Sequence, residues 1–176
     1  MLFRSYAADA LGYFKQQGIV LNRTIVAGPS AIAAVASGNL DVVMGATGNP
    51  VLANKSGADV LIVGSMTRQF GPGIVVSKKW TDSHKLTAQS STKDKIAALK
   101  GISISVQQAG GGSDQLLRLI AEQGGLNYDR DMTVTSIADQ QAQIAALVNN
   151  RVDAIVTTPP YSNMTAKEIG GLLMLN

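Results

Sequence analysis

Short apolar runs alternate with helical stretches along the whole chain, and this rhythm is the feature that most constrains the fold. Runs such as DVVMGA at 41–46, VLIVG at 60–64 and IVVS at 74–77 do not alternate apolar with polar residues. Uninterrupted apolar runs are typical of strands buried on both faces of a parallel sheet. The strand–helix–strand order therefore predicts an α/β fold with mostly parallel sheets.

The pattern can be divided into expected elements. We expect strands at 25–26, 41–46, 60–64, 74–77, 102–106, 133–137 and 152–156, and helices at 6–17, 31–37, 50–55, 93–99, 113–122 and 140–148. Gly18 and Gly38 suit the ends of the first two helices, and Asp139 suits the N-cap of the last.

Two observations bear on domain organisation. The 176 residues suffice for one ordinary domain or two small lobes. The polar stretch KKWTDSHKLTAQSSTKD at 78–94 is the clearest break, and residues 32–48 resemble residues 144–160 when the chain is shifted by 112 positions. Both copies have an apolar helix face, a tight turn, an acidic strand start (Asp41 and Asp153) and a buried strand. The repeat predicts two similar halves, although Ala-rich α/β units also resemble one another by chance.

Composition excludes several kinds of site. The chain has no Cys and one His, so it has no disulfide, no thiolate or multi-histidine metal site and no cysteine nucleophile. Its 15 basic residues are scattered against 12 acidic ones, and few aromatics accompany them. We interpret this as solvated surface charge and expect no nucleic-acid partner. The net charge of +3 gives a mild positive field that suits capture of a small anion.

Gly110-Gly111-Gly112-Ser113-Asp114 is the most informative motif, because it connects an expected strand to an expected helix. Glycines let a backbone approach a ligand, and the first N–H groups of a helix attract anions. Ser113 can either cap the helix or donate its hydroxyl to a ligand. The motif lacks the Lys-Ser/Thr of a Walker loop, and Gln115 replaces the third Gly of a dinucleotide fingerprint. A turn that serves only packing is the alternative.

Similar loops follow other expected strands, at 28–30, 45–50 and 157–161. In open α/β sheets ligands bind beyond the carboxyl ends of the strands. Because these loops offer hydroxyls, amides and backbone N–H groups and hardly any ionisable groups, they favour binding of a small polar ligand over acid–base catalysis.

Candidate catalytic residues are few. The sequence has no GxSxG elbow, and His84 lies in the polar stretch, where a surface position is expected. Asp41 and Asp153 stand at strand starts, opposite the loops, and suit capping or solubility. Trp80 and Tyr128 are expected to pack, while Tyr6 and Tyr13 are seven residues apart on one helical face, which suits one core and one cleft position.

Five segments together resemble a known family: GYFKQQGI (12–19), AVASGNLDVVMG (34–45), GADVLIVGSM (57–66), IAALKGISISVQQAGGGSDQLLRLIAEQGGLN (96–127) and VDAIVTTPPYSNMTAKEIGG (152–171). Their order is similar to that of solute-binding proteins of ABC importers of the nitrate/sulfonate/taurine type, which are related to pyrimidine-precursor-binding proteins of thiamine metabolism. The resemblance implies the type 2 periplasmic-binding fold, in which two α/β lobes clamp a ligand in a cleft.

The resemblance also implies lobe boundaries. Residues 1–74 match part of lobe 1, residues 75–165 match lobe 2, and residues 166–176 match the start of a segment returning to lobe 1. The family has a signal peptide and a strand before this chain's first helix and continues beyond its last residue, so the chain is expected to be truncated at both ends. An incomplete lobe 1 leaves apolar surface uncovered, which favours self-association or a companion segment and makes transport by this chain alone doubtful.

The family's cleft, carried onto matching positions, gives the expected ligand-binding residues. They are Tyr6, Gly28, Pro29, Ser30, Ala46, Thr47, Gly48, Met66, Thr67, Gly111, Gly112, Ser113, Thr158 and Pro159. Backbone N–H groups and hydroxyls are expected to hold the anionic head of the ligand, with no cofactor, metal or catalytic residue.

The expected function is capture of a small anionic solute, such as a sulfonate, nitrate or taurine, for delivery to an ABC permease outside the cytoplasm. One alternative is an enzyme on the same fold, either pyrimidine-forming or a small-acid lyase. The absence of Cys and of a base in the cleft weakens it. The other alternative is a cytoplasmic ligand-sensing domain, which needs a signalling partner that these residues do not supply.

Overall fold

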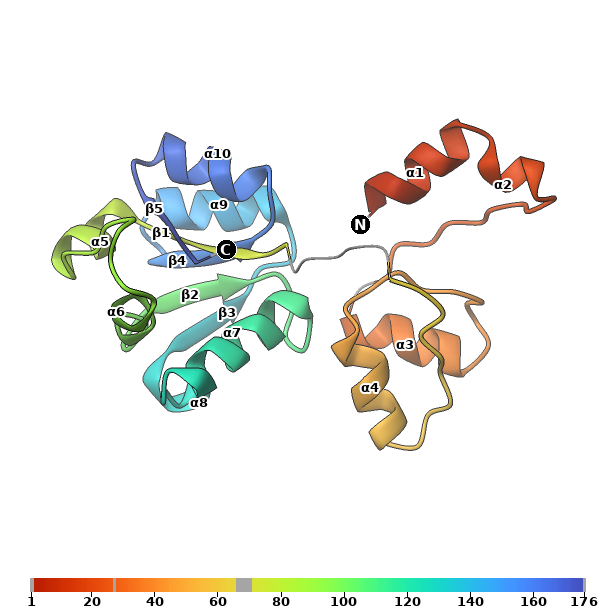
Figure 1. Cartoon of the computed structure of the whole chain (residues 1–176), viewed down its shortest axis with the longest axis horizontal. Helices are drawn as coiled ribbons and strands as arrows, with labels where there is room; N and C mark the ends of the chain where they lie inside the picture. The colour runs from red at the N-terminus through yellow and green to blue at the C-terminus, as the bar shows by residue number, and fades with distance from the viewer. Residues whose placement is uncertain (1, 27, 66–70, 176) are drawn as a thin grey trace. The chain divides into compact units, whose positions relative to one another are not determined.

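The computed structural model describes residues 2–26, 28–65 and 71–175. It divides into two compact units, Met1–Arg68 and Gln69–Asn176, which we call the first and second unit and describe separately. Both combine helices with extended segments (Figure 1). Among the described residues, no helix has the length and apolar character that crossing a membrane requires.

The second unit is built on a five-stranded sheet with the order β3-β2-β4-β1-β5. The strands are β1 (Gly73–Val76), β2 (Ser103–Val106), β3 (Thr133–Ser136), β4 (Ala154–Thr157) and β5 (Leu172–Leu175). β2 runs parallel to both β3 and β4, whereas β1 runs antiparallel to its neighbours β4 and β5. The mostly parallel α/β fold is confirmed for this unit, with β1 as the exception.

Helices cover both faces of this sheet (Figure 1). They are α5 (Lys78–Ser83), α6 (Thr92–Ala97), α7 (Gly112–Gln123), α8 (Tyr128–Asp131), α9 (Gln140–Val148) and α10 (Tyr161–Glu168). α5 to α8 contribute to the core cluster on one face, and α9 and α10 to the cluster on the other face.

The burial of β1 and β4 explains their apolar sequence. In β1, Ile74 and Val76 point into the cluster under α7, while Val75 points into the cluster under α9 and α10. In β4, Ile155 joins Val75 on the second face, and Val156 lies on the first. The interpretation of apolar runs as strands buried on both faces is therefore confirmed for β1 and β4. Strand direction does not follow from burial, so the antiparallel course of β1 was not predictable from it.

The helix ends of this unit follow local chemistry. α9 begins as predicted, because the Asp139 carboxylate accepts a hydrogen bond from the Ala142 N–H at 2.8 Å. The Asp153 carboxylate accepts the Ser103 N–H at 3.0 Å and so ties the start of β4 to the start of β2. The expected structural role of Asp153 is confirmed.

The first unit contains α1 (Leu2–Ala10), α2 (Tyr13–Gln16), α3 (Gly28–Ala36) and α4 (Gly48–Lys55). The expected helix at 6–17 is interrupted at Gly12, whose φ of 73° is left-handed. Tyr6 and Tyr13 therefore lie on separate helices, and both side chains are about half exposed. The prediction that they share one helical face is wrong.

The three strands expected in the first unit, at 25–26, 41–46 and 60–64, are not formed. Among the described residues, no backbone hydrogen bond joins one of these segments to another. Their apolar side chains are largely exposed, including Ile25 at 79% and Val42 at 70%. An extended segment becomes a strand only when a neighbour accepts and donates its backbone hydrogen bonds.

The internal repeat is only half realised. Residues 144–148 lie in α9 and residues 154–157 form β4, whereas in the first copy the α3 helix is followed by an extended segment without a ladder. Asp41 accordingly precedes no strand, in contrast to Asp153.

The division into units differs from the expected lobe boundaries. The break precedes β1, whereas residues up to 74 were expected in the first lobe. The polar stretch 78–94 does not separate the two units, because α5 lies in it and Trp80 packs against the core of the second unit, donating its indole N–H to Ala98 O at 3.1 Å. Residues 166–175 belong to the second unit, because β5 pairs with β1.

Candidate functional site

Loops gather at one edge of the second unit's sheet. Because β2, β3 and β4 are parallel, their carboxyl ends lie at the same edge. The segments 107–111, 137–139 and 158–160 leave the sheet there and lead into α7, α9 and α10. In parallel α/β sheets this edge is where ligands bind.

The glycine-rich loop after β2 ends at the first turn of α7. The first main-chain bond of that helix runs from Gln115 N to Gly111 O at 2.9 Å. In the described part of the chain, the N–H groups of Gly112, Ser113 and Asp114 donate to no backbone carbonyl. A twelve-residue helix therefore presents three N–H donors and the positive end of its dipole, a suitable arrangement for an anion.

Gly111 and Gly110 are required by geometry. A Cβ on Gly111 would lie 3.1 Å from Gln108 O, closer than ordinary van der Waals contact. Gly110 has a φ of 72°, in the left-handed region that favours glycine. The prediction that glycines permit a close backbone path here is consistent with both positions.

Of the two roles predicted for Ser113, capping of the helix is wrong, and donation to a ligand stays a prediction. Gly111 is the N-cap, so Ser113 is the second residue of the helix and does not cap it. Its Oγ accepts the Gln107 N–H at 3.3 Å, and the side chain is buried. The hydroxyl therefore connects the end of β2 to the start of α7 and retains its own proton for donation.

Asp114 carries a network that we did not predict. Its Oδ2 accepts the Gly110 N–H at 2.9 Å and Arg118 Nε at 3.1 Å, and its Oδ1 accepts the Tyr128 hydroxyl. Burial acts to raise the pKa of Asp114, but the hydrogen bonds from Tyr128, Gly110 and Arg118 outweigh it, so the pKa lies below 3.8. Asp114 is ionised at neutral pH.

Tyr128 is more than the packing residue that the sequence suggests. Its ring contacts the core cluster, and Arg118 Cζ lies 3.7 Å from the ring centroid. Burial and the hydrogen bond to Asp114 raise the pKa of the Tyr128 hydroxyl, which therefore stays protonated and remains a donor. The sequence contained one signal for this network, an acid and a base four residues apart on α7 (Asp114 and Arg118).

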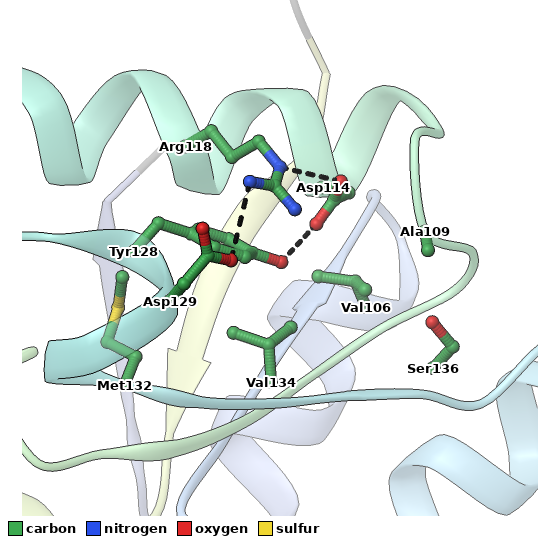
Figure 2. Close-up of a pocket in the computed structure, with 9 residues that line it drawn as sticks. All are labelled: Val106, Ala109, Asp114, Arg118, Tyr128, Asp129, Met132, Val134 and Ser136. Carbon is green, nitrogen blue, oxygen red and sulfur yellow. Dashed lines mark hydrogen bonds and ion pairs between the residues drawn. The ribbon is translucent and has the colours of Figure 1, made fainter.

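A pocket of about 280 Å³ lies between α7, α8 and the edge strand β3. Figure 2 shows Val106 and Val134 beside the Asp114–Tyr128–Arg118 network, with Ala109 and Ser136 at one end. Met132 and Asp129 complete the lining. The pocket therefore combines an apolar floor with polar side chains that already bind one another.

Thr158 and Pro159 follow β4 at the same sheet edge, and both are exposed. The preceding Thr157 is buried, and its Oγ1 accepts a hydrogen bond from Gln140 Nε2 at the start of α9. This contact connects the segments that follow β3 and β4. The structure thus brings the predicted residues of the second unit, Gly111 to Ser113 and Thr158 to Pro159, to one edge.

The predicted site residues of the first unit lie at helix starts. Gly28, Pro29 and Ser30 open α3, Thr47 is the N-cap of α4 without a side-chain cap bond, and Ala46 and Gly48 flank it. Tyr6 lies on α1, with Arg23 Cζ 4.4 Å from its ring centroid. Met66 and Thr67 lie outside the described residues. No contact recorded for these positions identifies a ligand, so they stay predictions.

In the described part of the chain, no three His, Cys, Asp or Glu residues come together in a group that could hold a metal ion. His84 is exposed, stacks on Trp80 at 4.1 Å between ring centroids and contacts Trp80 O through Nδ1. Its predicted surface position is confirmed.

Comparison with solved structures identifies the fold. The periplasmic aliphatic sulphonate binding protein SsuA of Escherichia coli is similar over 97% of this chain and 54% of its own, with 22% identity and a TM-score of 0.64. The alkanesulfonate-binding protein SsuA of Xanthomonas axonopodis pv. citri bound to MOPS is similar over 96% of this chain and 55% of its own, with 23% identity and a TM-score of 0.67. PhnD1 of Prochlorococcus marinus in complex with methylphosphonate is similar over 94% of this chain and 61% of its own, with 17% identity and a TM-score of 0.70.

This chain spans about half the length of the two sulfonate-binding proteins. Comparison with curated protein sequences gives no match. The architecture is that of the periplasmic binding proteins, and a family model matches residues 5–175. The chain belongs to the NMT1-like family.

Proposed function

We propose that this chain is the ligand-binding part of an ABC-importer solute-binding protein and that it binds a small anion. The observation that carries the proposal is the start of α7, beside a glycine-rich loop, where the N–H groups of Gly112, Ser113 and Asp114 donate to no backbone carbonyl of the described residues. Such donors suit a sulfonate, phosphonate or nitrate head group, whose oxygens accept several hydrogen bonds at once.

The proposal assigns an additional donor at the same edge. The Ser113 hydroxyl has an acceptor role toward Gln107 N and can donate its proton to the anion. Thr158, exposed after β4, offers a second hydroxyl. The similar structures include an aliphatic sulphonate binding protein, a protein bound to MOPS and one in complex with methylphosphonate, which supports an organic anion for this chain.

Calorimetry on the full 176-residue chain tests the proposal. We expect ethanesulfonate, methylphosphonate or nitrate to bind, and Ser113→Ala to weaken binding by about 1–2 kcal/mol, roughly tenfold, because one charge-assisted hydrogen bond is lost. Ser83→Ala is the control, since Ser83 is an exposed serine whose hydroxyl bonds Trp80 O on α5. Failure of all three anions to bind would refute the proposal.

Mass spectrometry of the recovered anion separates binding from the enzyme alternative. We expect the anion to be recovered unchanged after incubation with equimolar protein. A chemically altered product would instead favour an enzyme on the same fold.

The contribution of the first unit is a further part of the proposal. The family resemblance implies that residues 28–30 and 46–48 also contact the ligand. If they do, Ser30→Ala at the start of α3 weakens anion binding, whereas Ser37→Ala beyond the end of that helix leaves it unchanged. Equal affinities for both variants would remove the first unit from the site.

We also propose delivery of the solute to an ABC permease outside the cytoplasm, and self-association through the apolar surface of the first unit. Ile25, Leu61 and Val63 are each at least 79% exposed and supply such a surface. Light scattering should detect a dimer whose population rises with concentration, and a monomer at all concentrations would contradict self-association.

A further inference from the structure

The Asp114 carboxylate is a charged group that is almost fully enclosed by the second unit. Its residue is 1% exposed, and it lies in the first turn of α7, one residue after Ser113. A buried carboxylate is strongly unfavourable unless hydrogen bonds and an opposite charge compensate it. Three donors do so here, from Gly110, Tyr128 and Arg118.

The first of these donors belongs to the glycine-rich loop. Asp114 Oδ2 holds the Gly110 N–H at 2.9 Å, and Gln115 Nε2 donates to Gly110 O, also at 2.9 Å. Both sides of this glycine are therefore bound by side chains of the first helical turn. A loop of three consecutive glycines has high conformational entropy, and these two bonds restrict it before any ligand arrives.

The other donors fix the carboxylate itself. Tyr128 reaches Asp114 from α8, and Figure 2 shows its hydroxyl directed at the carboxylate. Arg118 stacks on the Tyr128 ring, and its Nη1 lies 3.7 Å from Asp129 Oδ1. The orientation of Asp114 is thus set by side chains from α7 and α8 as well as by the Gly110 N–H of the loop.

Two effects of Asp114 on a nearby anion oppose each other. By ordering the loop it lowers the entropy cost of binding, but its negative charge repels the anion. Arg118 offsets part of that repulsion because its guanidinium is paired with the same carboxylate. The sign of the change on neutralising Asp114 therefore shows which effect dominates.

We propose that Asp114, held by Tyr128 and Arg118, is a positioning residue that fixes the Gly110–Gly112 loop so that the N–H groups at the start of α7 converge on the anion. This inference rests on the proposed function. It adds Tyr128 and Arg118 to the residues that determine affinity, although neither was among the predicted ligand contacts.

Asp114→Asn and Tyr128→Phe in the full chain test this. We expect Asp114→Asn to weaken ethanesulfonate binding at least about tenfold, despite removing a negative charge, and Tyr128→Phe to weaken it about threefold to tenfold. The Gly110 amide should exchange faster with solvent in both variants without ligand, as measured by NMR. Binding is measured well below each variant's Tm, so that every protein is folded. A residue that only stabilises the fold would then leave the affinity for ethanesulfonate unchanged.

Asp94→Asn and Tyr13→Phe are the matched controls, because Asp94 is the first-turn acid of α6 and Tyr13 is half exposed on α2. Both should bind ethanesulfonate as the unsubstituted chain does. If Asp114→Asn does not fold, Tyr128→Phe decides alone. Equal or tighter binding with unchanged Gly110 exchange would overturn the inference.

Failure of the proposed function is distinguishable. If the unsubstituted chain binds neither ethanesulfonate nor methylphosphonate, the anion site is wrong, and the Gly110 amide alone decides whether Asp114 orders the loop. Faster exchange in both variants would retain that part of the inference, and unchanged exchange would reject it.

Discussion

Ile155 in β4 and Leu61 in the first unit both lie in short apolar runs, yet Ile155 is fully buried and Leu61 is 84% exposed. The run around Ile155 has β2 on one side and β1 on the other, with α9 and α10 over its face. The run around Leu61 has no ladder partner among the described residues. An apolar run therefore specifies a tendency to form a strand, and only its neighbours decide whether it is buried.

Hydrogen exchange should show the largest difference between the units. Amides of β2 and β4 are expected to exchange at least about 1,000-fold more slowly than those at 60–63, since opening them requires global unfolding of the second unit. Mass spectrometry of peptic fragments measures this. Comparable protection at 60–63 would show that the first unit acquires a sheet partner in solution. A repeat at tenfold dilution would then show whether that partner is a second copy.

Substitution of one isoleucine in each unit compares the two units directly. Ile104 is fully buried in the core cluster of the second unit, whereas Ile25 is 79% exposed. Ile104→Ala should lower the free energy of unfolding by about 2–5 kcal/mol, because it leaves a cavity, and Ile25→Ala by less than about 0.5 kcal/mol. Urea unfolding measures both. Similar losses for the two variants would mean that Ile25 is also packed in solution.

Acid should destabilise the second unit through Asp114. Its pKa is lowered in the folded protein, so its contribution to stability is present above the unfolded value near 3.8 and is lost as the pH falls through the folded pKa. At neutral pH Asp114→Asn should cost about 2–3 kcal/mol, because charge-assisted hydrogen bonds are lost. The variant's stability should then fall less steeply than that of the unsubstituted chain below pH 4. Parallel pH profiles would contradict this linkage.

The two acids of the internal repeat provide the smallest contrast. Asp153 accepts the Ser103 N–H at 3.0 Å, and Asp41 is exposed and precedes no strand. Asp153→Ala should lower stability by about 1–2 kcal/mol, and Asp41→Ala by almost nothing. Thermal unfolding compares them. A matching loss for Asp41→Ala would indicate that the first half of the repeat also forms its strand.

Local patterns predicted most elements of the second unit. The strands at 74–77, 102–106, 133–137 and 152–156 and the helices at 93–99, 113–122 and 140–148 correspond to observed elements with shifts of at most two residues at their ends. These predictions rest on periodicity and capping, which act between residues close in the chain. The glycine-rich loop at the start of α7 was predictable for the same reason.

Contacts between distant residues were not predictable in this way. Tyr128 lies 14 residues from Asp114, and Gln140 lies 17 residues from Thr157, and in both cases a polar side chain finds its partner only because two elements pack together. The polar stretch 78–94 shows the reverse error. Its composition indicates a break between two halves, but Trp80 turns one face of α5 toward the core.

The sequence by itself determined most of the helices and strands of the second unit, the apolar character of β1 and β4 on both faces, and the glycine-rich turn that opens α7. Those properties depend on backbone preferences and on side-chain burial that each segment carries with it. Tertiary structure decided the antiparallel course of β1, the inclusion of β5 in the sheet, and the burial of Asp114 among Tyr128, Arg118 and Gly110. Strand order and buried hydrogen bonds depend on which elements become neighbours, and no local pattern records that choice.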